Sequence, residues 1–248
     1  MSNLPSSTQI QRVVLATDGS AHARAATSFA AALAWPVGAV VSVASVMEAP
    51  SLSDLPISQR DESALADWRQ VLEQSYATAH EQTMAYAAVS AAVLRARHPG
   101  VDIDEVICLG EPAAELLSLA RAVDAELMIA GARGRTVWEG LLLGSVSEAL
   151  VTEAPCPVLI VRQETAGVRA VLVALRTVAD ADRLAAACLR LPLPPATKVV
   201  AVAVSAPRPP AAPAGRSFAP GKTEALLAAW DKAEHAAAEA AGARFVER

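Results

Sequence analysis

The chain has few cysteines, few aromatic residues and no excess of positive charge. Its 248 residues include three cysteines without CxxC spacing, so we expect reduced, buried thiols and neither a disulfide framework nor a zinc site. The four histidines are dispersed, and none forms a convincing metal-binding pair. A formal net charge of −5 gives no reason to expect nucleic acid or an anionic membrane as a partner. A local cationic loop could still hold phosphate.

One uncharged run, from Ala25 to Met47, is long enough to cross a bilayer. Trp35-Pro36-Val37-Gly38 interrupts it, with alanine-rich sequence typical of a helix before the break and β-branched sequence typical of a buried strand after it. Residues 1–11 lack the apolar core of a secretory signal. We therefore expect two elements of a globular fold, no membrane partner and, by default, a cytoplasmic location.

Apolar strand-like segments alternate with helix-like segments through the first two thirds of the chain. Hydrophobic residues make up 53% of the sequence, which is ample for a core. The order predicts a doubly wound, mostly parallel five-stranded sheet of Rossmann-like type, with a ligand cleft at the carboxyl ends of the strands. In the long second helix, apolar spacing that includes Leu65, Tyr76 and Thr83 predicts a buried stripe. We place strands at residues 12–16, 39–46, 101–109, 125–130 and 156–162, and helices at 21–34, 61–97, 113–123 and after Ser145.

The most informative motif is a glycine-rich stretch that follows the fourth predicted strand. Gly131 and Gly134 precede Gly144 and Ser145, where a helix is expected to start. Glycine lets the backbone approach a phosphate closely, and a helix N-terminus favours negative charge. Each glycine also has an ordinary explanation, as a strand-end turn, a left-handed loop position or a helix start. Ser145 could likewise be a plain helix cap.

A carboxylate at the end of the first strand supports the ligand interpretation. The strand runs into Thr17-Asp18-Gly19-Ser20, which places Asp18 at the edge where open α/β sheets bind ligands. Asp18 is better suited to accept hydrogen bonds from a nucleoside than to neutralise phosphate, because like charges repel. Arg133 and Arg135 are candidate phosphate contacts, although loop arginines often only face solvent. The two elements together predict a nucleotide site.

These residues resemble the universal stress protein family, whose ATP-binding members carry Gly-x2-Gly-x9-Gly-Ser/Thr after a first strand that ends in aspartate. The pattern is complete here, and the resemblance covers about Arg12 to Arg162. It implies an adenine nucleotide alpha hydrolase-like fold, ATP as ligand with Mg²⁺ as an optional companion, and homodimers formed through the last strands. Our predicted nucleotide-binding residues are Ala16, Thr17, Asp18, Val46, Gly131, Arg133, Gly134, Gly144, Ser145, Val146 and Ser147.

The sequence offers binding groups without an evident catalytic set. It has no paired-carboxylate site, no convincing Ser-His-Asp order and no Ser-Gly-Gly-x-Asp-Ser loop of the ATP pyrophosphatases. We therefore assign no catalytic residues and expect an ATP-binding stress-response regulator with an unknown protein partner. The alternatives are a slow ATP hydrolase, in which Asp18 assists a metal-bound phosphate, and a dimerising scaffold with a vestigial pocket.

After Gly167 the sequence begins a similar pattern again. Residues 169–175 parallel residues 12–18, and residues 199–203 parallel residues 40–44, with helical sequence between the two strands. This indicates a second, partial α/β repeat.

The second repeat lacks the residues that would bind a nucleotide. Leu175 stands in the position of Asp18, and no second glycine loop follows. We therefore predict a nucleotide-binding domain at residues 10–163 and a degenerate, truncated repeat at residues 168–248. The repeat is expected to pack beside the first domain, as a partner subunit would.

Overall fold

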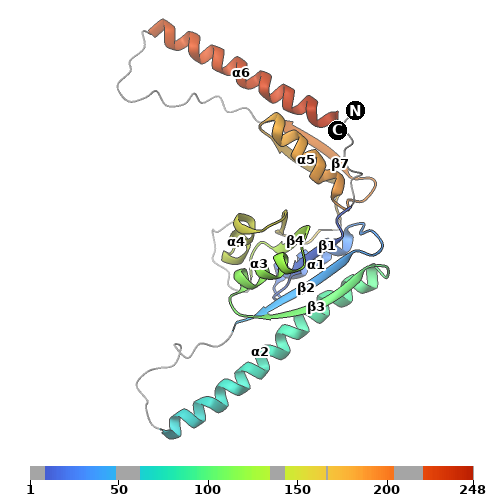
Figure 1. The fold of residues 1–248 in the computed structure, drawn as a ribbon, viewed down its shortest axis with the longest axis vertical. Helices are drawn as coiled ribbons and strands as arrows, with labels where there is room; N and C mark the ends of the chain where they lie inside the picture. The colour runs from blue at the N-terminus through green and yellow to red at the C-terminus, as the bar shows by residue number, and fades with distance from the viewer. Residues whose placement is uncertain (1–8, 49–61, 135–142, 166, 204–219, 248) are drawn as a thin grey trace. The chain divides into compact units, whose positions relative to one another are not determined.

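The computed structural model describes residues 9–48, 62–134, 143–165, 167–203 and 220–247 (Figure 1). The chain divides into two compact units, and the boundary lies between Gly167 and Val168. Within the described residues, no helix is both long and apolar enough to cross a membrane.

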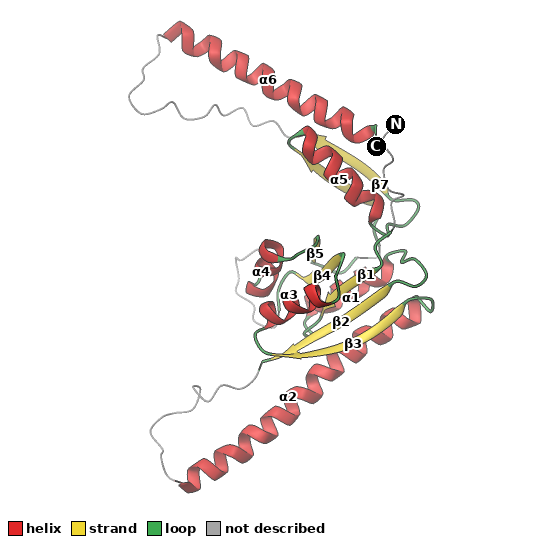
Figure 2. Cartoon of the chain, viewed as in Figure 1, coloured by secondary structure: helices red, strands yellow, loops and turns green. Residues whose placement is uncertain are grey.

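The first unit contains a parallel sheet whose strand order is β3-β2-β1-β4-β5. Its strands are mainly apolar because helices cover both faces of a parallel sheet. The sheet confirms the five-stranded, doubly wound architecture predicted from the sequence, and Figure 2 shows strands and helices alternating along the chain. The strands are β1 (Arg12–Ala16), β2 (Val40–Met47), β3 (Asp102–Leu109), β4 (Leu127–Gly131) and β5 (Val158–Val161).

Two pairs of helices accompany this sheet. Helices α1 (Ala21–Ala32) and α2 (Glu62–Arg97) pack against each other, as do α3 (Pro112–Ala122) and α4 (Ser145–Glu153). Because α1, α3 and α4 each follow a strand in this parallel sheet, their N-termini lie near its carboxyl edge.

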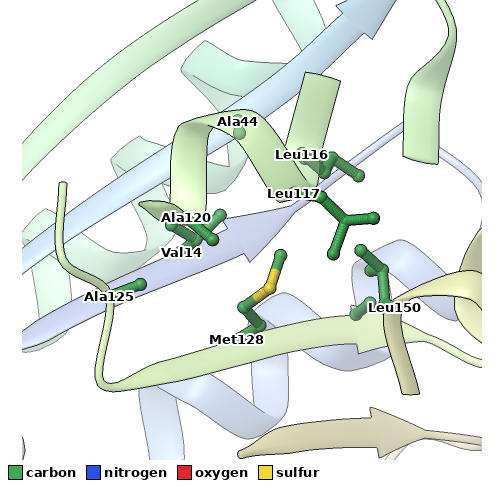
Figure 3. Close-up of a cluster of buried hydrophobic side chains, with 9 residues drawn as sticks. Val14, Ala44, Leu116, Leu117, Ala120, Ala125, Met128 and Leu150 are labelled. Carbon is green, nitrogen blue, oxygen red and sulfur yellow. The ribbon is translucent and has the colours of Figure 1, made fainter. Parts of the chain in front are cut away.

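The core beneath α3 and α4 fixes these helices to the sheet (Figure 3). Val14 of β1 and Met128 of β4 contribute from the strands, while Leu116 of α3 and Leu150 of α4 contribute from the helices. All four side chains are buried. The position of the α4 N-terminus therefore depends on apolar packing one and a half turns further along the helix.

The second unit is smaller and contains two parallel strands and two helices. Strands β6 (Ala170–Leu175) and β7 (Lys198–Ala203) pair, with α5 (Val178–Arg190) between them in sequence and α6 (Pro220–Val246) after them. Its core includes Val173, Leu175, Ala181 and Ala241. Leu175 is thus a core residue where the first unit has Asp18, and the interpretation of this unit as a degenerate repeat stays a prediction.

Candidate functional site

A cavity of about 530 Å³ opens at the carboxyl edge of the five-stranded sheet. This size lies within the range of small-molecule sites, and such edges are where open α/β sheets bind ligands. Its lining includes every residue that the sequence predicted for the nucleotide site, namely Ala16, Thr17, Asp18, Val46, Gly131, Arg133, Gly134, Gly144, Ser145, Val146 and Ser147. Segments more than a hundred residues apart in sequence therefore meet in one pocket.

The start of α4 differs from the starts of α1 and α3, whose caps the structure also describes. Its N-cap is Gly144, which has no side chain and therefore makes no capping hydrogen bond. By contrast, Ser20 caps α1 through the Ala23 N–H, and Glu111 caps α3 through two backbone N–H groups. The first-turn N–H groups of α4 thus lack a capping side chain where the helix meets the cavity, which favours an anionic ligand.

Two serines at this helix start have different positions. The interpretation of Ser145 as a helix cap is wrong, because the cap lies one residue earlier and Ser145 is the first residue of the helix, exposed to solvent. Ser147 is buried, and its Oγ donates a hydrogen bond of 2.6 Å to the carbonyl of Gly131. A hydroxyl has a single hydrogen, so Ser147 cannot donate to phosphate while this bond is present.

Asp18, which also lines the cavity, is held by a turn. The Ser20 N–H donates to Asp18 Oδ1 over 3.0 Å, and Gly19 adopts a φ of 72°. The second carboxylate oxygen points towards the glycine loop, because a Cβ atom placed on Gly134 would lie 2.9 Å from Asp18 Oδ2. Asp18 and Gly19 therefore form a turn that leaves Oδ2 beside the loop.

Thr17 anchors the end of β1. Its N–H donates to the carbonyl of Ala44 over 2.8 Å, and its hydroxyl accepts from Ser90 Oγ over 3.2 Å. Ser90 in turn hydrogen-bonds to Thr27 over 3.1 Å, and all three hydroxyl-bearing side chains are buried. These hydrogen-bonded hydroxyls connect the end of β1 with α1 and α2 at the residue that precedes Asp18.

Gly131 permits close packing between β4 and α1. A Cβ atom at this position would lie 2.6 Å from the carbonyl carbon of His22 and 2.8 Å from the nitrogen of Ala23, both of which are backbone atoms. Gly134 does not have a positive φ, so its interpretation as a left-handed loop residue is wrong. The structure thus gives Gly131 a packing role that is independent of any ligand.

Arg133 lines the cavity and is partly buried. Its carbonyl accepts a hydrogen bond from Ser20 Oγ over 3.4 Å, which links the glycine loop to the start of α1. Arg135, the other candidate phosphate contact, lies outside the described residues.

Several lining residues were missed by the sequence reasoning. Glu48 follows β2 as Asp18 follows β1, and this shared place after a strand was the available signal. Leu116 reaches the pocket from α3, which sequence spacing alone does not reveal because it depends on how the helix packs. The other missed residues are Ala23, Ala44, Pro112, Ala130 and Leu143.

The titratable groups do not form a metal cluster or an activated thiol in the described part of the chain. No group of three or more His, Cys, Asp or Glu residues there is placed to hold a metal ion. Burial raises the pKa of Cys108, Cys156 and Cys188, and the charge of Glu115 raises that of Cys108 further. The three thiols are free but only partly buried, which corrects the expectation of full burial.

Comparison with known proteins gives a family and a fold. A model of the universal stress protein family matches residues 9–162. A universal stress protein from Thermus aquaticus is 35% identical over 151 residues, which cover 60% of this chain and 97% of the relative. The solved structure of hypothetical protein MJ0577 is 19% identical and covers 64% of this chain and 100% of that one, with a TM-score of 0.52. A universal stress protein solved in complex with cAMP is 27% identical and covers 63% of this chain and 100% of that one, with a TM-score of 0.43.

Proposed function

Because this chain belongs to the universal stress protein family, we propose that its first unit binds an adenine nucleotide, with ATP preferred, and acts as a nucleotide-dependent regulator of the stress response. The observation that carries the proposal is the α4 N-terminus, whose N-cap Gly144 supplies no capping side chain and which lines a cavity that Asp18 also lines. A phosphate would accept hydrogen bonds from the first-turn N–H groups of α4, as the Ser20 and Glu111 side chains do at the starts of α1 and α3.

The charges within the cavity set the orientation of the nucleotide. Phosphate groups belong near Ser145 at the start of α4 and not beside Gly134, because Asp18 Oδ2 lies next to Gly134 and both Asp18 and Glu48 would repel them. The two carboxylates instead suit hydrogen-bond donors, such as ribose hydroxyls or an exocyclic amino group. Mg²⁺ would accompany ATP mainly through the phosphates, since such sites need only one or two protein carboxylates.

Binding rather than hydrolysis is the favoured role. Asp18, the carboxylate assigned to a slow hydrolase, already accepts a backbone hydrogen bond through Oδ1. Single-turnover measurements with radiolabelled ATP test the alternative, and turnover that disappears in an Asp18→Ala variant would support it.

A proline at position 145 tests the phosphate site. Proline is favoured at the first residue of a helix, as Pro112 is in α3, and Gly144 has the extended ψ of 166° that a following proline requires. Ser145→Pro therefore removes one N–H donor with little disturbance, and Ser145→Ala is the control that removes only the hydroxyl. A hydrogen bond to a charged group is worth about 1.5–3 kcal/mol, so ATP affinity should fall roughly 10- to 100-fold in the proline variant.

Calorimetric titration with ATP, ADP, AMP, cAMP, GTP and adenosine separates the two halves of the site. The proline substitution should lower the affinity for phosphorylated ligands and leave the affinity for adenosine unchanged. Absence of binding by any adenine nucleotide at millimolar concentration would refute the proposal. Equal affinities of the proline and alanine variants would refute the assigned phosphate position.

We include a homodimer and a cytoplasmic location in the proposal. Strand β5 forms one edge of the sheet, and its Val158, Leu159 and Ile160 are only partly buried, which suits pairing with the same strand of a second copy. Three free thiols suit a reducing compartment. Light scattering of the purified chain tests the dimer.

A further inference from the structure

The outer side of α2 is apolar along three turns. From Thr83 to Leu94 the polar residues, Thr83 and Ser90, are buried. The exposed fractions are 49% for Met84, 61% for Val89 and 42% for Val93. This is the reverse of an ordinary surface helix, whose polar residues face solvent. The exposed residues of this stretch, which we call the outer α2 face, are Met84, Ala85, Ala88, Val89, Ala92 and Val93.

The centre of the outer α2 face has the spacing of a two-helix seam. Glu81, Ala85, Ala88, Ala92 and Arg95 follow one another at intervals of four, three, four and three residues, which is the heptad pattern of packed helices. Alanine in the middle of such a seam allows two helices to approach closely. The seam therefore fits another helix, with an acidic group at one end and a basic group at the other.

We propose that the outer α2 face binds the same face of a second copy of this chain, with the two helices antiparallel. A two-fold axis midway between Ala88 and Val89 would place Ala85 opposite the partner's Ala92. It would also bring Glu81 and the partner's Arg95 to nearly the same height along the helix axis, about 1.5 Å apart in that direction. A parallel pair in the same register would instead place like charges together. The charges at the two ends of the seam thus select the antiparallel arrangement.

Arg95 is held in place for this contact. Its guanidinium donates to Glu105 Oε1 over 2.6 Å and to the carbonyl of Ile103 over 2.8 Å, while its side chain remains 49% exposed. Guanidinium has five N–H donors, so it can serve a second carboxylate as well. The cation is therefore positioned before a partner arrives, which limits the entropy lost on association.

This contact is separate from one along β5. Helix α2 packs on β2 and β3, whereas β5 is the opposite edge of the sheet. The contact also requires no nucleotide. Its failure and the failure of the proposed nucleotide site are therefore distinguishable.

Cysteine crosslinking of the full chain tests the geometry directly. The two-fold axis places both copies of residue 88 side by side, so Ala88→Cys should form a disulfide-linked dimer under mild oxidation. Thr78→Cys, on an exposed turn of the same helix outside the outer α2 face, should stay uncrosslinked, as should the parent chain with its native cysteines. Equal crosslinking of both variants, or none in Ala88→Cys, would overturn the proposal.

Sedimentation equilibrium gives a second test. Val89→Glu places two carboxylates beside each other in the contact and should raise the dissociation constant of one association step at least tenfold. Ser75→Glu adds the same charge at an exposed position off the seam spacing and should leave the constant unchanged. Glu81→Lys should weaken association about fivefold at low salt, because two symmetric surface ion pairs are lost. A monomeric parent chain, or identical association of the Val89→Glu variant, would refute the inference.

Discussion

Gly131→Ala should destabilise the first unit even without a ligand. The added methyl group would lie 2.6 Å from the carbonyl carbon of His22 and 2.8 Å from the nitrogen of Ala23. These atoms belong to the backbone at the start of α1 and cannot rotate away as a side chain can. Gly144→Ala is the matched control, because its nearest neighbour outside the adjacent residues is the Cα of Arg133 at 3.4 Å.

The size of the effect follows from the distances. An ordinary contact between carbon atoms lies at about 3.5–4.0 Å, so α1 must move by about 1 Å to accept the methyl group. Such overpacking costs about 1–3 kcal/mol. At Gly144 the conformation is extended and the contact is close to ordinary, so loss of a favourable N-cap glycine should cost about 1 kcal/mol or less.

Urea unfolding followed by circular dichroism measures both free energies of unfolding. We expect the Gly131→Ala value to fall by about 1–3 kcal/mol, which is more than the loss in Gly144→Ala. If Gly131→Ala retained the parental stability and lost only nucleotide affinity, the packing argument would be refuted. Gly131 would then be required by the ligand alone.

Three further predictions concern the site and the second unit. Gly134→Ala should cost little stability, because its methyl group meets only a side-chain oxygen, Asp18 Oδ2, but it should weaken adenosine binding by displacing that oxygen. Unchanged adenosine affinity in calorimetry would contradict this. Leu150→Ala should lower the free energy of unfolding in urea by about 2–5 kcal/mol, since the side chain is fully buried; a loss below 1 kcal/mol would contradict the packing beneath α4. The hydrogen bond from the Thr177 side chain lowers the pKa of Asp180 in the folded chain below its ordinary value. The ionised carboxylate should therefore stabilise the fold above the ordinary pKa, and this stabilisation should be lost as the pH falls through the pKa of the folded state. Asp180→Asn should remove this acid dependence. If hydrogen exchange in α5 had the same pH profile in the variant as in the parent chain, the prediction would be contradicted.

The order of elements and part of the pocket lining could be predicted because both depend on local patterns. Apolar runs identify buried parallel strands, and residues that follow such strands necessarily meet at one edge. Glu48 obeyed this same rule and could have been found by it. The reason for each glycine could not be predicted, because the distance between Gly131 and His22 depends on how α1 packs against β4.

The burial pattern of α2 was predicted only in part. Thr83 is buried, as the helical spacing required, but Tyr76 is 36% exposed, which contradicts the predicted stripe at that position. The side chain of Leu65 lies outside the described ones. Periodicity locates an apolar face without showing whether the sheet is long enough to cover it. Helix α2 has 36 residues, whereas the strands it covers have eight each, so part of the helix extends beyond them.

The central place of β1 also has a consequence for synthesis of the chain. This strand pairs with β2 on one side and with β4 on the other, and its partner residues in β4 include Leu127 for Val13. At 5–20 residues per second, a nascent chain needs roughly ten seconds between these two strands. During that interval the edge of β1 that will pair with β4 remains unpaired, and the glycine loop that will lie beside Asp18 has not yet been synthesised. The proposed ligand site can therefore form only after the glycine loop and the start of α4 have left the ribosome.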